Sequence, residues 1–180
     1  HPLFEQSSRQ NSYLYVMIPD RSQTAAFTGR RVYRDEAADL LPVTLEALYR
    51  RGYRCFLSGM AAGFDLAAAE AVAEFRTRRP DAVLVCVVPF PGQPERLPAA
   101  DRIRYDRLIA TADRVVMVGE RYTPDCYARR NDYLVDHASY VVAYFDGRPS
   151  GGTYYTVRRA HRRHLPVENL FPDTQLTLDF

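Results

Sequence analysis

The sequence contains neither lysine nor tryptophan, and all 24 of its basic residues are arginine. The absence of lysine excludes three kinds of chemistry: a Walker-type phosphate lysine, a Schiff base and a lysine general base. Arginine remains available, and its planar guanidinium can hold a phosphate through two parallel hydrogen bonds. A phosphate site in this chain must therefore rely on arginine, neutral side-chain donors or backbone N–H groups.

Cysteine and long apolar runs are also scarce. The three cysteines (Cys55, Cys86 and Cys126) lack paired metal-ligand spacing, and His161 and His164 have no third ligand in view, so no metal site is expected. No apolar stretch approaches the ~20 residues that cross a bilayer. No charged-then-apolar segment opens the sequence. We therefore expect a cytoplasmic protein without membrane contact.

Length and charge favour one globular domain. A chain of 180 residues supports a single hydrophobic core. Its formal net charge of +2 is too small for a dedicated duplex-DNA binder, which is expected to be strongly basic. Regular patterning begins near Thr24. We expect residues 1–22 to form an arm, mobile or added at a sheet edge, and residues 23–180 to form one ligand-binding domain.

Strand-like runs alternate with helix-like segments along the chain. Residues 82–88 are continuously apolar, as expected for a strand covered on both faces. Leu41, Leu45 and Leu48 recur at helical spacing, and Gly52 follows as a stop. This alternation predicts an α/β fold: a Rossmann-like, doubly wound, mostly parallel sheet with helices on both faces. The expected strands are 24–28, 55–57, 82–88, 114–118, 140–145 and 166–170, and the expected helices are 39–51, 66–75, 99–112, 129–137 and 153–164.

Two glycine-containing turns each join a strand-like run to a helix-like run. The first glycine turn is Ser58-Gly59-Met60-Ala61-Ala62-Gly63-Phe64-Asp65, and the second is Asp146-Gly147-Arg148-Pro149-Ser150-Gly151-Gly152-Thr153. At the carboxyl ends of strands, glycine lets the backbone approach an anion that faces the N–H groups of the next helix. Either turn alone also fits a purely structural connection, and neither is the dinucleotide fingerprint. Together they predict a phosphorylated ligand.

Four motifs then appear in a specific order. They are Phe27-Thr28-Gly29-Arg30-Arg31, the first glycine turn through Glu70, Arg129-Arg130-Asn131-Asp132-Tyr133-Leu134-Val135-Asp136, and Tyr144-Phe145 through the second glycine turn. Over about residues 24–170 the chain resembles the YpsA-like family of the SLOG (Smf/DprA–LOG) superfamily of Rossmann-like ligand binders. The resemblance implies binding or sensing of a nucleotide-derived ligand (NAD, ADP-ribose or nucleoside phosphate type) at the strand carboxyl ends, with no required cofactor.

The resemblance also implies a set of site residues. Asp65 and Glu70 are the candidate catalytic residues, should the chain be an enzyme. Two positions depart from the family pattern: Arg30 stands where the family usually has histidine, and Ser139-Tyr140 where it tends to carry an acid. The implied ligand-binding residues are Gly29, Arg30, Ser58, Gly59, Gly63, Asp65, Glu70, Arg130, Asn131, Gly151, Gly152 and Thr153.

Two other functions stay open. One is a LOG-like nucleoside-monophosphate phosphoribohydrolase, an N-glycosidic hydrolase, although the second turn lacks the second glycine and the trailing glutamate of the LOG motif PGGxGTxxE. The other is single-stranded nucleic-acid binding as in the DprA branch, which needs a basic groove with aromatic platforms. The basic string Arg158, Arg159, Arg162 and Arg163 also suits a solvated helix C-terminus, so nucleic acid is disfavoured as a partner. A homo-oligomer is compatible with the sequence.

Overall fold

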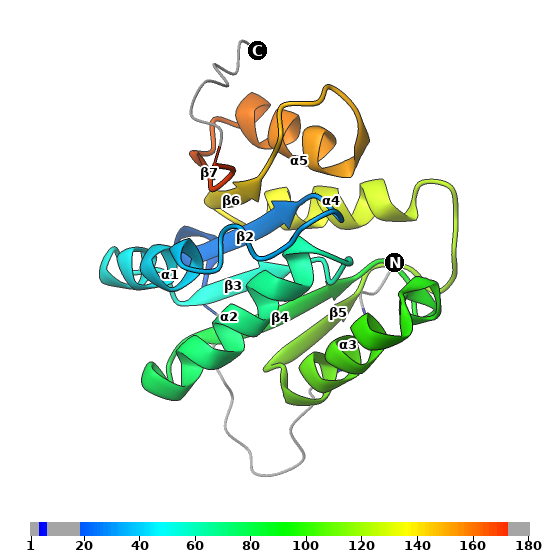
Figure 1. The fold of residues 1–180 in the computed structure, drawn as a ribbon, viewed down its shortest axis with the longest axis horizontal. Coiled ribbons are helices and arrows are strands. Elements are labelled where there is room, and N and C mark those ends of the chain that lie inside the picture. The colour runs from blue at the N-terminus through cyan, green and yellow to red at the C-terminus, as the bar shows by residue number, and fades with distance from the viewer. Residues whose placement is uncertain (1–3, 7–18, 173–180) are drawn as a thin grey trace.

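A seven-stranded sheet forms the centre of the protein (Figure 1). The structure is a computed structural model that describes residues 4–6 and 19–172. The strand order is β1-β5-β4-β3-β2-β6-β7, with β1 antiparallel to β5 and all other pairs parallel. The strands are β1 (Phe4–Gln6), β2 (Thr24–Gly29), β3 (Cys55–Ser58), β4 (Val83–Val88), β5 (Arg114–Met117), β6 (Tyr140–Tyr144) and β7 (Val167–Asn169).

Helices cover both faces of the sheet. Leu45 and Val72 share one core cluster with Phe27 of β2, whereas Leu134 packs with Leu57 on the opposite face. Thus α1, α2 and α3 lie on one face and α4 and α5 on the other (Figure 1). The helices are α1 (Leu40–Arg50), α2 (Phe64–Arg78), α3 (Ala99–Thr111), α4 (Cys126–Asp136) and α5 (Gly151–Arg162), with short 3-10 turns η1 (Arg21–Gln23) and η2 (Gln93–Arg96).

The predicted fold class is confirmed, with small differences at element ends. Every residue of β3, β4 and β6 is buried, as continuous apolar runs require. Helix α1 ends before Gly52, whose φ of +99° suits glycine at a helix C-terminus. Helix α4 begins three residues earlier than expected, at Cys126, and α2 extends to Arg78. Within the N-terminal arm, residues 4–6 pair with β5, while the run 13–18 lies outside the described residues.

The chain reverses its direction of travel across the sheet between β2 and β6. From β2 it proceeds to β3 on one side, and from β6 to β7 on the other, although β2 and β6 are neighbours. Connections that leave in opposite directions open a crevice at the strand carboxyl ends, where α/β proteins bind ligands. Both glycine turns lie at this edge, after β3 and after β6. Within the described residues, no helix is long and apolar enough to cross a membrane.

Candidate ligand-binding site at the strand carboxyl ends

The first glycine turn is held from inside by its own hydrogen bonds. The fully buried Ser58 hydroxyl donates to the backbone oxygen of Asp65 at 2.8 Å and accepts from the backbone N–H of Met60 at 3.2 Å. At the start of α2, the N–H of Phe64 donates to the Arg30 carbonyl at 3.2 Å. Several amides of this turn are therefore already used within the protein, and Ser58 acts as a brace.

Two buried side chains contact the carbonyl of Gly59. The Arg130 guanidinium donates to this oxygen, and Gln93 Nε2 of η2 donates to it at 3.1 Å. A Cβ at Gly59 would lie 2.8 Å from Arg130 Nη1, so only glycine leaves room for this packing. Gln93 was not expected from the sequence, because a lone glutamine in a proline-rich loop gives no functional signal. Its Oε1 is buried and has no hydrogen-bond partner.

Asp65, the last residue of the first glycine turn, has a buried carboxyl group. It accepts hydrogen bonds from the backbone N–H groups of Gly29 and Ala61. Burial raises the pKa of Asp65 to about 6, although the nearby Arg130 charge and these two bonds act in the opposite direction. Its Oδ1 has no hydrogen-bond partner. The first turn thus covers two unpaired acceptors, Asp65 Oδ1 and Gln93 Oε1.

Gly29 and Gly63 allow the loop after β2 and the start of α2 to approach each other closely. A Cβ at Gly29 would collide with the Phe64 side chain, and one at Gly63 would collide with the carbonyls of Arg30 and Arg31. Gly63 also has a φ of +84° just before α2, a conformation that strains other residues. Both glycines therefore shape the edge of the sheet by bringing the loop after β2 against α2.

Arg30 holds the second glycine turn in place. Its Nε donates to Asp146 Oδ1 at 3.0 Å, its Nη1 to the Ser150 carbonyl at 2.8 Å, and its Nη2 to the Arg148 carbonyl at 2.9 Å. The guanidinium also lies 5.4 Å from the Phe145 ring centroid. All three guanidinium nitrogens therefore have protein partners, which makes Arg30 a support for the turn rather than an uncommitted phosphate ligand.

The second turn ends at the start of α5, where side-chain donors converge. Ser150, at the N-cap, makes no capping hydrogen bond. A Cβ at Gly151 would lie 2.8 Å from Arg30 Nη1, and one at Gly152 would lie 3.3 Å from Asn131 Nδ2. The backbone N–H groups at the start of a helix point out of it along its axis. At α5 these groups therefore lie close to the side-chain donors beside Gly151 and Gly152. Thr153, the third residue of α5, is buried there.

Arg130 sets the direction of the Asn131 amide. Arg130 Nε donates to Asn131 Oδ1 at 2.8 Å, which leaves the Asn131 NH2 group to face Gly152. Both side chains are buried, and burial lowers the pKa of Arg130 while the Asp65 charge opposes that shift. Arg130 thus links the first turn, through the Gly59 carbonyl, to the second turn, through Asn131.

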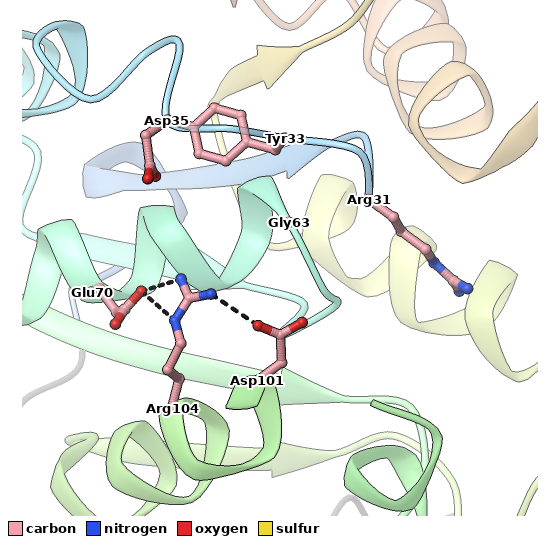
Figure 2. A pocket seen from close by; sticks show the side chains of 7 residues that line it. All are labelled: Arg31, Tyr33, Asp35, Gly63, Glu70, Asp101 and Arg104. Atoms are coloured by element: carbon pink, nitrogen blue, oxygen red, sulfur yellow. Dashed lines mark hydrogen bonds and ion pairs between the residues drawn. The ribbon is translucent and has the colours of Figure 1, made fainter. Parts of the chain in front are cut away.

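Glu70 is separated from the other candidate residues except Gly63, which lines the same pocket. It lies on the side of α2 that faces α3, where its carboxylate is bonded to Arg104, and Arg104 Nη1 also contacts Asp101 at 3.0 Å (Figure 2). This ion-pair group lines a pocket of about 400 Å³ that also contains Arg31, Tyr33, Asp35 and Gly63. Three carboxylates in one pocket disfavour a phosphate there. The buried Asp65 is not among its lining residues.

The predicted site residues therefore fall into two groups. Those of the two turns and of α4 meet at the carboxyl ends of β2, β3 and β6, whereas Glu70 lies apart. Ser139, at the position where the family tends to carry an acid, precedes β6 and so lies at the opposite edge of the sheet, where its N–H donates to the Thr24 carbonyl. In the described residues, no three His, Cys, Asp or Glu side chains gather as a metal site.

Comparison with known proteins matches this chain to one protein family and to bacterial relatives. The family model YpsA, described as the YspA SLOG family, matches residues 38–172, a span that begins after the Thr28-Gly29-Arg30 motif. The chain is 28% identical over 154 residues to the uncharacterized SPbeta prophage-derived protein YoqJ of Bacillus subtilis, covering 78% of this chain and 90% of YoqJ. It is also 28% identical over 121 residues to a UPF0398 protein of Bacillus cereus, covering 63% of this chain and 65% of that protein.

Two solved structures share the fold. DNA processing protein A (DprA) from Streptococcus pneumoniae aligns with a TM-score of 0.61 at 20% identity, over 81% of this chain and 49% of that one. DprA from Helicobacter pylori, solved to show its single-stranded DNA binding mode, aligns with a TM-score of 0.61 at 16% identity, over 82% of this chain and 64% of that one. At these identities the likeness establishes the fold alone.

Proposed function

This chain belongs to the YspA SLOG family, and on that premise we propose that it binds or senses a nucleotide-derived ligand at the carboxyl ends of its strands. The observation that carries the proposal is the start of α5. There an uncapped helix N-terminus and the Asn131 NH2 group converge at Gly152, on a turn that the Arg30 guanidinium holds in place. These groups are all donors, which suits the oxygens of a phosphate.

The binding free energy available at this site favours a whole nucleotide over free phosphate as the ligand. A helix start contributes about 0.3–1 kcal/mol to an anion, and each charged hydrogen bond contributes about 1.5–3 kcal/mol. Micromolar binding requires about 8 kcal/mol after the cost of association. One helix start with one or two such bonds falls short of this value. We infer that sugar or base contacts supply the remainder.

The arrangement of the acids gives less support to hydrolysis. Asp65 is buried and bonded to the backbone N–H groups of Gly29 and Ala61, while Glu70 is engaged with Arg104. A phosphoribohydrolase would need acids that reach the bond between base and sugar. We therefore place the hydrolase second, as an outcome that the binding experiment can detect.

The C-terminal part of α5 gives little support to nucleic-acid binding. Arg159 pairs with Asp132 at 3.3 Å and with Asp136 at 3.0 Å, and Arg163 also pairs with Asp136 at 3.0 Å. Acidic residues of α4 thus neutralise part of the basic string, which lowers its attraction for a phosphate backbone. Single-stranded DNA binding, which is named for the Helicobacter pylori DprA, is retained as the third candidate because of the shared fold.

A thermal-shift screen tests the proposal. The purified chain is heated with nucleoside mono- and diphosphates, NAD, ADP-ribose and cyclic nucleotides, and each mixture is analysed by chromatography. We expect a rise in melting temperature with an intact ligand, and loss of that rise in Gly152→Val. Release of free base would assign the hydrolase instead. A rise that persists in Gly152→Val, or no rise with any compound, would contradict the proposed site.

A further inference from the structure

Three aromatic rings from separate segments meet beside the candidate site. They are Phe90, which follows β4, Tyr122, which follows β5, and Tyr127 in the first turn of α4. Their ring centroids are 5.7 Å apart for Phe90–Tyr122, 6.1 Å for Phe90–Tyr127 and 6.5 Å for Tyr122–Tyr127, all edge to face. We call these three residues the aromatic cluster. Phe90 is buried and supports Tyr122, which is 47% exposed.

Guanidinium groups surround this cluster. The Arg96 Cζ lies 4.1 Å from the Tyr122 ring centroid, and the Arg31 Cζ lies 5.6 Å from that of Tyr127. In Figure 2 the Arg31 side chain extends toward α4 from the edge of the pocket that it helps to line. Both arginines are exposed. The exposed Tyr122 ring has the Arg96 guanidinium near it, and the neighbouring Tyr127 ring has that of Arg31. The cluster thus combines π-faces with positive charge, and these are the two features that attract a nucleic-acid base joined to a phosphate.

Helix α4 connects the aromatic cluster to the phosphate donors. Tyr127 and Asn131 are four residues apart and lie on the same side of the helix, about 6 Å apart along its axis. Arg130 contacts both the aromatic cluster and the phosphate donors. Its Cζ lies 5.8 Å from the Tyr127 ring centroid, and its Nε donates to Asn131 Oδ1. One helical turn thus separates Tyr127 from Asn131, and the Tyr122 ring centroid lies 6.5 Å from that of Tyr127.

Short segment η2 ties the cluster to the first turn as well. Its first residue, Gln93, donates to the Gly59 carbonyl, and its last, Arg96, lies over the Tyr122 ring. The position of Arg96 is therefore coupled to the first glycine turn. The aromatic cluster is a continuation of the site and not a separate patch.

We propose that the aromatic cluster is the base-stacking part of the ligand site, with the base on Tyr122 and the phosphate at the start of α5. This inference rests on the proposed function and makes it more specific. The ligand should carry a nucleobase, because a sugar phosphate has no flat ring to stack on the exposed part of Tyr122. Every base has a π-face, so the subsite distinguishes nucleotides from sugar phosphates better than it distinguishes one base from another.

Isothermal titration calorimetry of the native chain and Tyr122→Ala tests this assignment. The probes are the four nucleoside 5′-monophosphates and ribose 5-phosphate, which keeps the sugar and phosphate and lacks the base. We expect the native chain to bind the nucleotides about tenfold more tightly than ribose 5-phosphate. Tyr122→Ala should bind both classes with the affinity of ribose 5-phosphate, and Tyr122→Phe should bind like the native chain.

Tyr49→Ala is the matched control. Tyr49 also has two guanidinium groups near its ring, those of Arg54 and Arg79 at 3.7 and 4.8 Å, but it lies near the C-terminal end of α1, away from the strand carboxyl ends. Its replacement should leave nucleotide affinity unchanged. Thermal unfolding of each variant confirms that the folded protein is being titrated.

Each remaining outcome rejects the inference in a distinct way. Unchanged nucleotide affinity in Tyr122→Ala overturns the base subsite, and the proposed function still stands if Gly152→Val abolishes binding. Failure of every probe to bind the native chain overturns the base subsite, and the proposed function falls with it only if no compound of the thermal-shift screen binds. If Tyr122→Ala loses affinity for oligothymidylate alone, the cluster belongs to a single-strand surface and the nucleotide assignment is wrong.

Discussion

Arg130 determines which way the Asn131 amide points, because its Nε donates to Asn131 Oδ1 at 2.8 Å. The NH2 group of Asn131 is left facing Gly152 at the start of α5. A buried arginine that was expected to hold phosphate directly is therefore a positioning residue. Its charge still contributes to the potential at the site, since the groups around it are buried and poorly screened.

Replacing Asn131 should separate the effect of the amide donor from that of local charge. Asn131→Ala removes one donor and should weaken nucleotide binding about fivefold to tenfold, as the loss of one hydrogen bond implies. Asn131→Asp should weaken it further, because a carboxylate would then face the phosphate. Titration calorimetry with a nucleoside monophosphate measures both. Equal affinities for the native chain and Asn131→Asp would show that the phosphate lies elsewhere.

Gly151→Ala should destabilise the protein more than Gly52→Ala does. Both glycines have positive φ, at +89° and +99°, so alanine introduces similar backbone strain of about 1 kcal/mol at each. At Gly52 a Cβ would meet nothing within 4 Å, whereas at Gly151 it would lie 2.8 Å from Arg30 Nη1. The excess loss in Gly151→Ala, measured by urea unfolding, therefore reports the clash with Arg30. Equal losses would mean that Arg30 moves aside freely.

Arg30→Lys should loosen the second glycine turn. Lysine cannot reproduce the fork that contacts Asp146 and two carbonyls, so we expect a loss of about 1–3 kcal/mol in the free energy of unfolding. Faster hydrogen exchange at residues 147–151 should accompany it. Arg148→Lys is the matched control, because Arg148 approaches the same Asp146 carboxylate at 3.5 Å but is 81% exposed. That change should have almost no effect.

Asp65 should make stability fall as pH rises. Its pKa is about 6 in the folded protein, above the ordinary value of 3.8, so the folded state retains the proton that the unfolded chain releases. The stabilising contribution is complete below pH 3.8 and is lost as pH rises through 6. Relative to Asp65→Asn, the native chain should lose on the order of 2–3 kcal/mol across that window. Urea unfolding at intervals from pH 3.5 to 7.5 measures the difference.

Asp81 supplies the opposite control for that titration. A hydrogen bond from the Tyr49 hydroxyl lowers the pKa of Asp81, so its contribution is present above pH 3.8 and lost as pH falls below that value. Comparison with Asp81→Asn should therefore give a slope of the other sign at acid pH. A flat difference between the native chain and Asp65→Asn would mean that Asp65 is solvated in solution.

Local signals explain what the sequence predicted well. Continuous apolar runs and glycine are properties of a few adjacent residues, and they correctly located the six parallel strands and both turns, whereas the antiparallel strand β1 was not predicted. The sequence also contained the information that Asp65 and Glu70 lie on different faces of α2, because five residues turn an α-helix by about 140° beyond one full turn. Those two acids face different neighbours for that reason.

Pairings between distant residues were not predictable from the sequence alone. Arg30 meets Asp146 across 116 residues of chain, and Arg130 meets the Gly59 carbonyl across 71. Both arginines looked like phosphate ligands because their internal partners appear only once β2, β3 and β6 lie side by side. Burial of Arg130 was equally hidden, since arginine is almost never buried unless it is paired.

The sheet begins and ends with its shortest strands. In the described structure β1 and β7 are each three residues long, whereas the strands between them have four to six residues. Among the described residues, either end of the sheet offers a neighbouring molecule only three strand residues to pair with. Short edges of this kind discourage strand-by-strand aggregation, so the long buried strands that build the site carry little risk of polymerisation.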